Sequence, residues 1–240
     1  MTRDNDPKTP EYVLKDLERL ILRIGANEHW YEQTWLGVPI WQLPGDLIRM
    51  QNVVFQSKPR WIIETGTKFG GSALFFSSML HLLGLEGGGV LTVDIQLKTE
   101  AKKLFRDHPL GGLVRVALEG DAASETTAAC FQAEIAKNPG PVMVFLDDNH
   151  NADHVYRELQ LYSPLIGIDG YLVVADTVFE DLAGTPVGAP TDKYPDVVTS
   201  NPRVAVDRFL AENSAFERDF RFSRNGFGNF SDGFLRRTAK

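Results

Sequence analysis

Residues 61–72, WIIETGTKFGGS, pass from a short apolar run into a turn that contains three glycines. The run Trp61–Ile63 has the length and apolar character of a buried strand, and Glu64 follows it directly. Glycines allow a tight turn and let a ligand approach the backbone closely. The turn resembles the Gly-x-Gly-x-x-Gly dinucleotide pattern without fitting it, and it can equally be a structural link between strand and helix. The stretch therefore predicts the first strand of an α/β sheet, with a candidate ligand site at its end.

The rest of the chain repeats this alternation of short apolar runs and helix-length segments. Most of the runs end in an acid, and they span Val90–Asp94, Leu113–Leu118, Val142–Asp147 and Tyr171–Asp176. Such an alternation is typical of a doubly wound, mostly parallel sheet with helices on both faces. Two later runs, Phe216–Phe222 and Gly233–Arg237, predict a C-terminal antiparallel hairpin. The expected fold class is therefore α/β, of the Rossmann-like kind.

Further helices and loops are predicted before the first strand and before the C-terminal hairpin. Helices are expected over Glu11–Leu22, over Asp46–Gln56 and near Val204–Glu212, the last preceded by a Gly/Pro-rich loop. Between the first two helices, the proline-broken, aromatic-rich stretch Trp30–Pro44 predicts an ordered loop. We expect a single domain over residues 1–240, with residues 1–58 as a helical and aromatic N-terminal extension.

Four aromatic side chains stand out in this extension: Trp30, Tyr31, Trp35 and Trp41. Aromatic anchors are common both in lids over a substrate and in subunit contacts, so either role is a hypothesis for them. Ordinary core packing is an equally good interpretation, because large aromatics dominate buried area in general.

Composition and charge narrow the class of partner. The 240 residues are 43% hydrophobic and 24% charged, as in ordinary globular proteins, and the formal net charge is −7. An acidic chain has no general affinity for nucleic acid or anionic membranes, which leaves a small molecule as the expected partner. Cys130 is the only cysteine, and no apolar run approaches the ~20 residues that a membrane span needs. We therefore expect a cytoplasmic protein that binds neither nucleic acid nor membrane.

Acids near the ends of the first three predicted strands indicate the kind of cofactor. Glu64, directly before the turn, would repel a pyrophosphate but suits a cationic sulfonium and an amino group. Asp94 can accept hydrogen bonds from both hydroxyls of a ribose, or it is a solvated acid or a helix cap. Asp121 lies where an adenine would be placed, and it is also a candidate N-cap. The candidate cofactor-binding residues are Glu64, Gly66, Thr67, Gly70, Gly71, Ser72, Asp94, Asp121 and Asp147.

The strongest signal is a pair of acids at the ends of two neighbouring predicted strands. Residues 144–150, VFLDDNH, and residues 172–178, LVVADTV, would bring Asp147 and Asp176 together at one edge of a parallel sheet. Adjacent carboxylates repel unless they are protonated or bridged by a cation, and oxygen ligands favour a hard ion such as Mg²⁺. The alternative is that one acid caps a helix while the other pairs with a surface Lys or Arg.

Two histidines follow Asp147 closely in the sequence. His150 is a candidate general base, because a neutral imidazole can accept a hydroxyl proton near neutral pH. His154, one helical turn further on, is a candidate for indirect support of the metal site, for a substrate contact or for a surface role. No comparable acidic setting surrounds the remaining histidines, and we assign structural or surface roles to His29, His81 and His108.

At these residues the chain resembles the cephalosporin hydroxylase family, whose members are similar to methyltransferases despite the name. The likeness is carried by residues 62–72, 146–150 and 171–177, and by residues 35–44 before the first strand. The resemblance implies a Rossmann-like methyltransferase fold and S-adenosylmethionine as the cofactor. It also implies methyl transfer to a hydroxyl of a small molecule, a sugar or a secondary metabolite, assisted by Mg²⁺ or another divalent cation.

A more distant likeness to catechol O-methyltransferase concerns the metal and the base. It implies that Asp147, Asp176 and Thr177 hold the ion, although relatives commonly have Asn or an acid at the position of Thr177. Asp148, Glu180 or water are alternatives for the third ligand. His150 matches the position of the catalytic lysine in the catechol enzymes, so the resemblance makes His150 and Asp147 the expected catalytic residues.

Two other functions remain open at this point. A nicotinamide-dependent oxidoreductase shares the parallel sheet, the glycine-rich turn and the acid after the second strand, although Glu64 and the acid pair disfavour it. A non-catalytic cofactor-binding protein of the same fold is the other alternative. We further expect residues 1–58 to cover the acceptor side of the site, and the chain to form a homo-oligomer.

Overall fold

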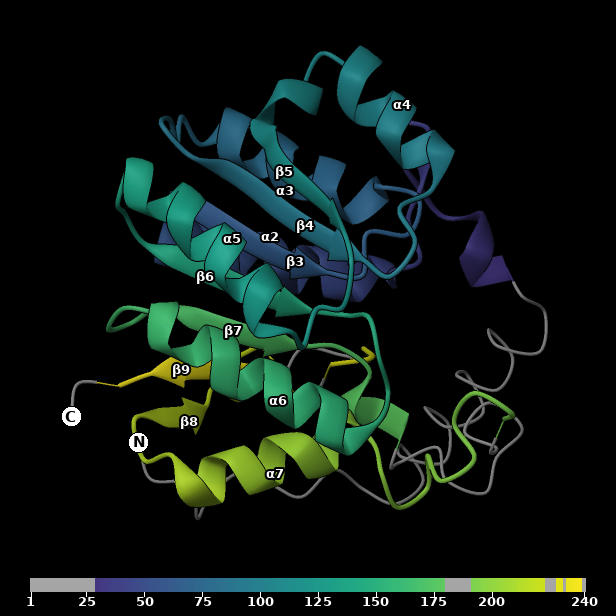
Figure 1. The fold of residues 1–240 in the computed structure, drawn as a ribbon, viewed down its shortest axis with the longest axis vertical. Helices are drawn as coiled ribbons and strands as arrows, with labels where there is room; N and C mark the ends of the chain where they lie inside the picture. The colour runs from purple at the N-terminus through teal and green to yellow at the C-terminus, as the bar shows by residue number, and fades with distance from the viewer. Residues whose placement is uncertain (1–28, 180–190, 223–227, 231, 239–240) are drawn as a thin grey trace.

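The computed structural model describes residues 29–179, 191–222, 228–230 and 232–238 (Figure 1). The helix predicted over Glu11–Leu22 and the candidate ligand Glu180 lie outside the described residues, as does much of the Gly/Pro-rich loop. No helix in the described ranges is both long and apolar enough to cross a membrane.

A seven-stranded sheet forms the centre of the structure, in the order β5-β4-β3-β6-β7-β9-β8. Its strands are β3 (Trp61–Thr65), β4 (Gly89–Asp94), β5 (Val114–Glu119), β6 (Val142–Leu146), β7 (Tyr171–Val174), β8 (Phe216–Arg218) and β9 (Phe234–Arg237). Strands β3 to β7 run parallel, while β9 is antiparallel to both β7 and β8. The predicted α/β class, the mostly parallel sheet and the C-terminal antiparallel hairpin are confirmed.

Helices cover both faces of the sheet (Figure 1). On one face lie α2 (Pro44–Ser57), α3 (Gly71–Leu82) and α4 (Thr99–Asp107), and on the other lie α5 (Glu125–Lys137), α6 (Ala152–Tyr162) and α7 (Pro202–Glu212). Short 3₁₀ helices occur at η2 (His29–Glu32), η3 (Gly111–Leu113), η4 (Ser163–Leu165) and η5 (Thr177–Phe179). Each face has its own buried cluster, centred on α5, α6 and α7 in one case and on α2 and α3 in the other.

The central strands are shorter at their carboxyl ends than the sequence predicts. Strand β6 ends at Leu146 and β7 at Val174, so Asp147 and Asp176 lie just beyond the ladder. Asp176 has φ +57°, a left-handed conformation that a strand does not contain. The backbone therefore turns at this acid, and the carboxylate is left at the open edge of the sheet.

The order of the strands reverses at β3, which pairs with β4 on one side and β6 on the other. Connections leave the sheet toward opposite faces at such a point, and a crevice opens beyond the carboxyl ends of the strands. The end of β3 is tied to both neighbours there: the N–H of Gly66 bonds to the carbonyl of Val93 in β4, and the N–H of Asp147, just after β6, bonds to the carbonyl of Thr65.

We expect Gly66→Ala to be strongly destabilising. A Cβ at Gly66 would lie 2.1 Å from the carbonyl oxygen of Asp147, and the backbone there has φ +88°. Gly84→Ala is the matched control, since Gly84 also has a positive φ, +63°, but nothing lies within 4 Å of its Cβ position. The control should lose roughly 1–2 kcal/mol of the free energy of unfolding through backbone strain, and Gly66→Ala roughly 1–3 kcal/mol more through overpacking. Equal losses in denaturant titrations of the two variants would contradict the close approach.

Candidate active site

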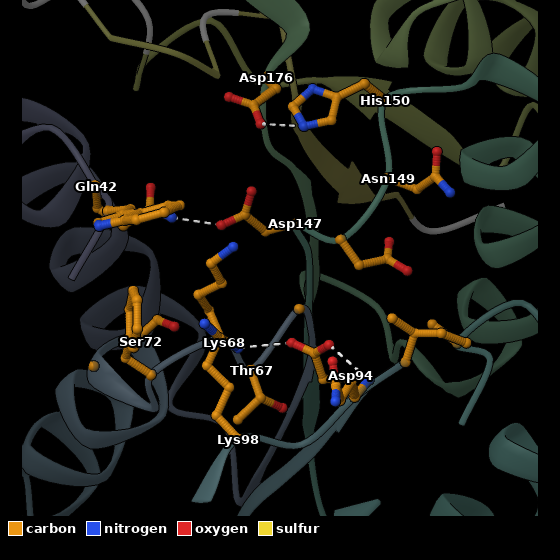
Figure 2. Close-up of a pocket in the computed structure, with 18 of the residues that line it drawn as sticks. Gln42, Thr67, Lys68, Ser72, Asp94, Lys98, Asp147, Asn149, His150 and Asp176 are labelled. Atoms are coloured by element: carbon orange, nitrogen blue, oxygen red, sulfur yellow. Dashed lines mark hydrogen bonds and ion pairs between the residues drawn. The ribbon is translucent and has the colours of Figure 1, made fainter. Parts of the chain in front are cut away.

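A cavity of about 730 Å³ lies beyond the carboxyl ends of the parallel strands (Figure 2). It brings together residues from the β3–α3 turn, the ends of β4 and β5, the loops after β6 and β7, and the segment before α2. Predicted site residues that line it are Gly66, Thr67, Gly71, Ser72, Asp94, Asp121, Asp147, His150 and Asp176. Segments far apart in the sequence thus meet at one site.

The glycine-rich turn is held by a chain of hydroxyl hydrogen bonds. Thr92 donates to a carboxylate oxygen of Glu64 at 2.6 Å, so the hydroxyl of Thr67, 2.6 Å from that of Thr92, donates to Thr92 in turn. Glu64 is fully buried and is not among the residues that line the cavity. Its carboxylate therefore lies beneath the turn, and it can act on a ligand through Thr67, through Ser72 or through its electric field.

Burial raises the pKa of Glu64 to about 7, against the lowering effect of hydroxyl groups of Ser72 and Thr92. A raised carboxyl pKa means that the folded state holds the proton more tightly than the unfolded chain does. The stabilising contribution is complete below the ordinary pKa of 4.5 and is lost as the pH rises to about 7.

Glu64→Gln should therefore remove a pH dependence of stability. Without cofactor, the wild type should become less stable relative to the variant by up to roughly 1.4 kcal/mol per pH unit between pH 4.5 and about 7. The Gln side chain keeps an oxygen that can accept from Thr92, so packing is retained. The measurement is the free energy of unfolding of both proteins across this pH range, and parallel curves would show that Glu64 is ionised in both states.

The next part of the turn starts α3 close to the N-terminal segment. Gly70 is the N-cap residue with φ +85°, and a Cβ at Gly71 would lie 2.2 Å from the carbonyl oxygen of Pro39. A glycine at position 71 therefore lets the first turn of α3 pack directly against the strand β2 (Val38–Pro39), which forms a two-stranded antiparallel pair with β1 (Thr34–Trp35). Ser72 follows on the cavity wall.

Asp94, at the end of β4, supports the turn as well as facing the cavity. One carboxylate oxygen accepts the backbone N–H of Lys68 at 2.7 Å, and the other accepts that of Gln96 at 3.1 Å. Lys68 has φ +47°, so this hydrogen bond helps to hold a strained position. Asp94 is not the cap of the following helix, because α4 begins at Thr99 with Lys98 as its N-cap residue.

Asp121, which lines the cavity after β5, is not a helix cap either. Its carboxylate accepts the N–H of Ala123 at 2.9 Å in a local turn. The N-cap of α5 is Ser124, whose side chain accepts the N–H of Thr127. The capping alternative is therefore wrong, and the Asp121 side chain remains exposed beside the cavity.

The carboxylates of Asp147 and Asp176 both face the cavity (Figure 2). Withdrawal from water raises the pKa of Asp147 well above its ordinary range, and the negative charge of Asp176 raises it further. Burial also raises the pKa of Asp176, while His150 lowers it. The amide nitrogen of Gln42 donates to Asp147 at 2.5 Å. The two acids thus form an electrostatically coupled pair, as the sequence predicts for neighbouring strand ends.

Gln42 is a site residue that no chemical motif in the sequence indicates. It is buried just before α2, and it meets Asp147 across 105 positions of the chain. The only signal in the sequence was the likeness of residues 35–44 to the corresponding segment of the cephalosporin hydroxylase family.

His150 lies beside this acid pair. Its Nε2 is 3.6 Å from a carboxylate oxygen of Asp176, and its ring packs against the rings of Phe179 and Tyr194, each with a centroid distance of 4.6 Å. The Nδ1 atom is buried and has no hydrogen-bond partner among the described residues. Nε2 is therefore the nitrogen that can exchange a proton with a bound molecule.

Thr177 is directed to another part of the structure. Its side chain is fully buried, donates to the carbonyl of Asn229 at 3.4 Å and accepts the N–H of Asp232 at 3.3 Å. These contacts hold η5 against the segment before β9. Within the described residues, no side-chain contact connects Thr177 with the Asp147–Asp176 pair.

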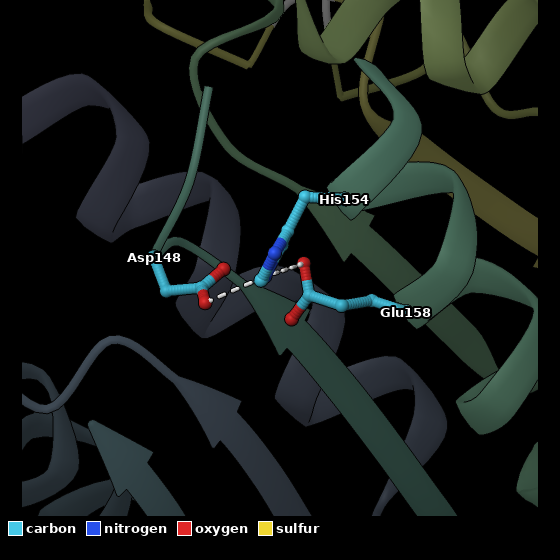
Figure 3. Close-up of side chains that lie close together, drawn as sticks. All are labelled: Asp148, His154 and Glu158. Carbon is cyan, nitrogen blue, oxygen red and sulfur yellow. Dashed lines mark hydrogen bonds and ion pairs between the residues drawn. The ribbon is translucent and has the colours of Figure 1, made fainter. Parts of the chain in front are cut away.

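Asp148 and His154 form a second polar group beside the pair (Figure 3). A carboxylate oxygen of Asp148 lies 3.0 Å from Nε2 of His154, which is 3.8 Å from a carboxylate oxygen of Glu158. The pKa of His154 is raised: burial lowers it, but the hydrogen bond and charge of Asp148 outweigh that effect. Burial, and then the charge of Asp148, raise the pKa of Glu158 well above its ordinary range. Asp148 is thus directed toward α6.

The aromatic residues of the N-terminal segment divide between two roles. Trp35 belongs to the core: its ring meets that of Phe75 at 4.9 Å, and its indole N–H donates to Ser78. Tyr31 and Trp41 line the cavity and pack against each other at 4.5 Å. Among the three whose side chains are described, Tyr31 and Trp41 are placed to contact a ligand, and the side chain of Trp30 lies outside the described part.

Solved structures of CmcI and of an O-methyltransferase share this fold. The Mg–SAM form of CmcI matches with a TM-score of 0.60 and 17% identity, over 87% of this chain and 78% of that chain. An O-methyltransferase from Bacillus cereus in complex with SAH matches with a TM-score of 0.54 and 16% identity, over 97% and 93% of the two chains.

The family follows from the sequence comparison: the model of the rhamnosyl O-methyltransferase/CmcI family matches residues 27–238, and the chain belongs to this family. The rhamnosyl O-methyltransferase of Mycobacterium tuberculosis H37Rv is 31% identical over 164 residues, 68% of this chain. The chain spans only 62% of the length of that relative. Membership confirms the family resemblance predicted from the strand-end motifs.

Proposed function

We propose that the chain is an S-adenosylmethionine-dependent, Mg²⁺-assisted O-methyltransferase that acts on a hydroxyl of a small molecule. The observation that carries the proposal is the coupled pair Asp147–Asp176, which opens into the same cavity as the glycine-rich turn and Asp94. Membership in a family named for O-methyl transfer supports it. The SAM and SAH forms of the similar structures support the choice of cofactor.

The cofactor would lie along the ends of β3, β4 and β5. The turn from Gly66 to Ser72 lets its methionine part approach the backbone, Asp94 accepts from the ribose hydroxyls, and Asp121 borders the adenine. Each oxygen of Asp94 already accepts one backbone N–H, and a carboxylate oxygen has capacity for a second hydrogen bond. From beneath the turn, the negative charge of ionised Glu64 attracts the cationic sulfonium end of the cofactor. No cationic side chain among the described residues pairs with this carboxylate.

The donor set fits a divalent cation. Asp147 and Asp176 are two partly exposed carboxylates whose only close cationic candidate among the described side chains is His150. Oxygen ligands of this kind suit Mg²⁺, which commonly keeps several waters. The side-chain oxygen of Gln42 becomes available as a third ligand if the amide rotates by 180°. That Thr177 binds the metal ion stays a prediction, and no observed contact supports it.

His150 and Asp176 provide the proton transfer. When bound, the cofactor supplies the methyl group and the metal ion polarises the acceptor hydroxyl. His150 takes the hydroxyl proton at Nε2 while the oxygen forms its bond to the methyl carbon and the carbon–sulfur bond breaks, leaving its electron pair on sulfur. Asp176, 3.6 Å away, stabilises the imidazolium that results. Phe179 and Tyr194 keep the ring oriented toward the cavity.

The acceptor side is covered by the N-terminal extension, of which residues 29–58 are described. Tyr31 and Trp41 offer aromatic faces to the acceptor at the cavity wall. The names of the relatives favour a sugar hydroxyl as the acceptor.

We also propose that the protein forms one domain and a homo-oligomer. We further propose that it is cytoplasmic, as its single cysteine suggests, and that it binds neither nucleic acid nor membrane.

Titration calorimetry with S-adenosylhomocysteine, NAD and Mg²⁺ tests the proposal. The protein should bind S-adenosylhomocysteine and not NAD, and it should transfer methyl groups to hydroxyl compounds in the presence of Mg²⁺. Asp94→Ala should weaken S-adenosylhomocysteine binding by roughly 1.5–3 kcal/mol for each ribose hydrogen bond lost, with folding retained. Asp107→Ala, at an exposed acid on α4, is the control.

Two results would contradict these assignments. Unchanged affinity for S-adenosylhomocysteine in folded Asp94→Ala would show that Asp94 does not bind the ribose. Binding of NAD in preference to S-adenosylhomocysteine would favour the oxidoreductase alternative, and cofactor binding without transfer to any acceptor would favour the non-catalytic one.

A further inference from the structure

We propose that Asp148, His154 and Glu158 bind a divalent transition-metal ion such as Zn²⁺, at a site separate from the Asp147–Asp176 pair (Figure 3). The three side chains come from the loop after β6 and from two successive turns of α6. In Figure 3 the imidazole of His154 lies between the two carboxylates.

The spacing of the three donor atoms suits one ion. One ligand atom of each residue lies within 4.8 Å of the others. Nε2 of His154 is 3.0 Å from the Asp148 oxygen and 3.8 Å from the Glu158 oxygen. Ligands of a tetrahedral Zn²⁺ at 2.0–2.2 Å are separated from one another by roughly 3.4 Å, which lies between these two distances. Small side-chain rotations therefore bring all three atoms into coordination distance.

Glu158 provides an independent reason for a cation at this place. Its side chain is fully buried, and neither carboxylate oxygen has a hydrogen-bond partner in the described part of the chain. A buried carboxyl group without a hydrogen-bond partner is costly, whereas a coordinated ion satisfies its oxygens directly. One of these oxygens, Oε2, lies 3.8 Å from Nε2 of His154 and is directed into the cluster (Figure 3).

The donor types distinguish this site from the Mg²⁺ site. One imidazole nitrogen and two carboxylate oxygens favour a first-row transition ion, because imidazole suits Zn²⁺ and its neighbours while Mg²⁺ prefers oxygen ligands only. Asp148 and His154 line the cavity, so water or a ligand atom can take the fourth position. Bound there, the ion would fix the loop that carries Asp147 and His150 to α6.

Co²⁺ is a suitable probe, because its visible absorption reports coordination and Zn²⁺ displaces it. The 240-residue chain, freed of metal with a chelator, is titrated with Co²⁺ and then with Zn²⁺. The wild type and Asp147→Asn should both show the absorption band of a nitrogen-containing site. Glu158→Gln and His154→Gln should bind at least roughly tenfold more weakly, since even residues that only support a ligand change affinity 10–100-fold. Asp153→Asn, at an exposed acid on the same helix, should match the wild type.

The outcomes separate this site from the proposed Mg²⁺ site. A Co²⁺ band that disappears in Asp147→Asn, or one that persists at wild-type affinity in Glu158→Gln, would overturn the proposal. His154→Gln gives the same information should Glu158→Gln not fold, because His154 is only partly buried. The Co²⁺ absorption and its displacement by Zn²⁺ do not depend on methyl transfer. They therefore report on this site even if the proposed enzymatic function is wrong.

Discussion

Asp147→Asn and Asp176→Asn should each reduce methyl transfer by roughly two orders of magnitude or more, because each removes an anionic ligand from an ion worth several kcal/mol to the transition state. Affinity for S-adenosylhomocysteine should stay largely intact. In the wild type, added Mg²⁺ should raise the melting temperature, since an ion bound only by the folded state stabilises it by mass action. Neither variant should show this shift. The measurements are turnover and melting temperature, each with Mg²⁺ and with chelator.

The opposite result has a clear physical meaning. If no ion lies between the acids, their proximity is a repulsion, which adds to the effect of burial in raising the pKa of Asp147. Either Asn variant would then be more stable than the wild type, with no link between activity and Mg²⁺. Asp169→Asn, at an exposed acid paired with Arg236, controls for the general effect of removing one negative charge. Full activity in chelator would leave a metal-independent methyltransferase.

His150→Ala should lower turnover by roughly 10²–10⁴-fold, the usual contribution of a general base. The thermal shift with Mg²⁺ should persist, because His150 lies next to Asp176 without replacing it as a ligand. Loss of turnover with the Mg²⁺ shift retained would identify His150 as a base and not as a metal ligand. His81→Ala, at an exposed histidine on α3, is the control and should keep full turnover.

His150→Gln extends the test to packing. The Gln side chain keeps bulk between Phe179 and Tyr194 but cannot take a proton at neutral pH. If His150→Gln is as active as the wild type, the ring serves packing alone and another group accepts the proton.

The fold could be predicted from the sequence because its signals are local. Short apolar runs separated by helix-length segments specify parallel strands with crossover helices, and the handedness of such crossovers leaves few topologies. The same runs end in acids, and parallel strands place their carboxyl ends at one edge. Hence the meeting of Asp94, Asp147 and Asp176 at one cavity follows from strand order alone.

Side-chain direction at that edge depended on packing that no local pattern encodes. Asp147 and Asp148 are neighbours in sequence, yet one opens toward Asp176 and the other turns to His154. Glu64 is drawn beneath the turn by Thr92, a residue of the next strand. The direction of each of these side chains is therefore set by contacts with residues of other helices and strands.

The N-terminal segment shows the same division. Its aromatic content was evident in the sequence, but only the tertiary structure separates Trp35, whose indole bonds to Ser78 in the core, from Trp41 at the cavity. Gln42 reaches Asp147 because Gly71 lets this segment pack directly against α3. The sequence by itself therefore determined the mostly parallel sheet, its C-terminal antiparallel hairpin and the acids at the strand ends. The tertiary structure decided which of those acids face the cavity, because contacts between distant segments set the rotamer of each side chain and its exposure to water.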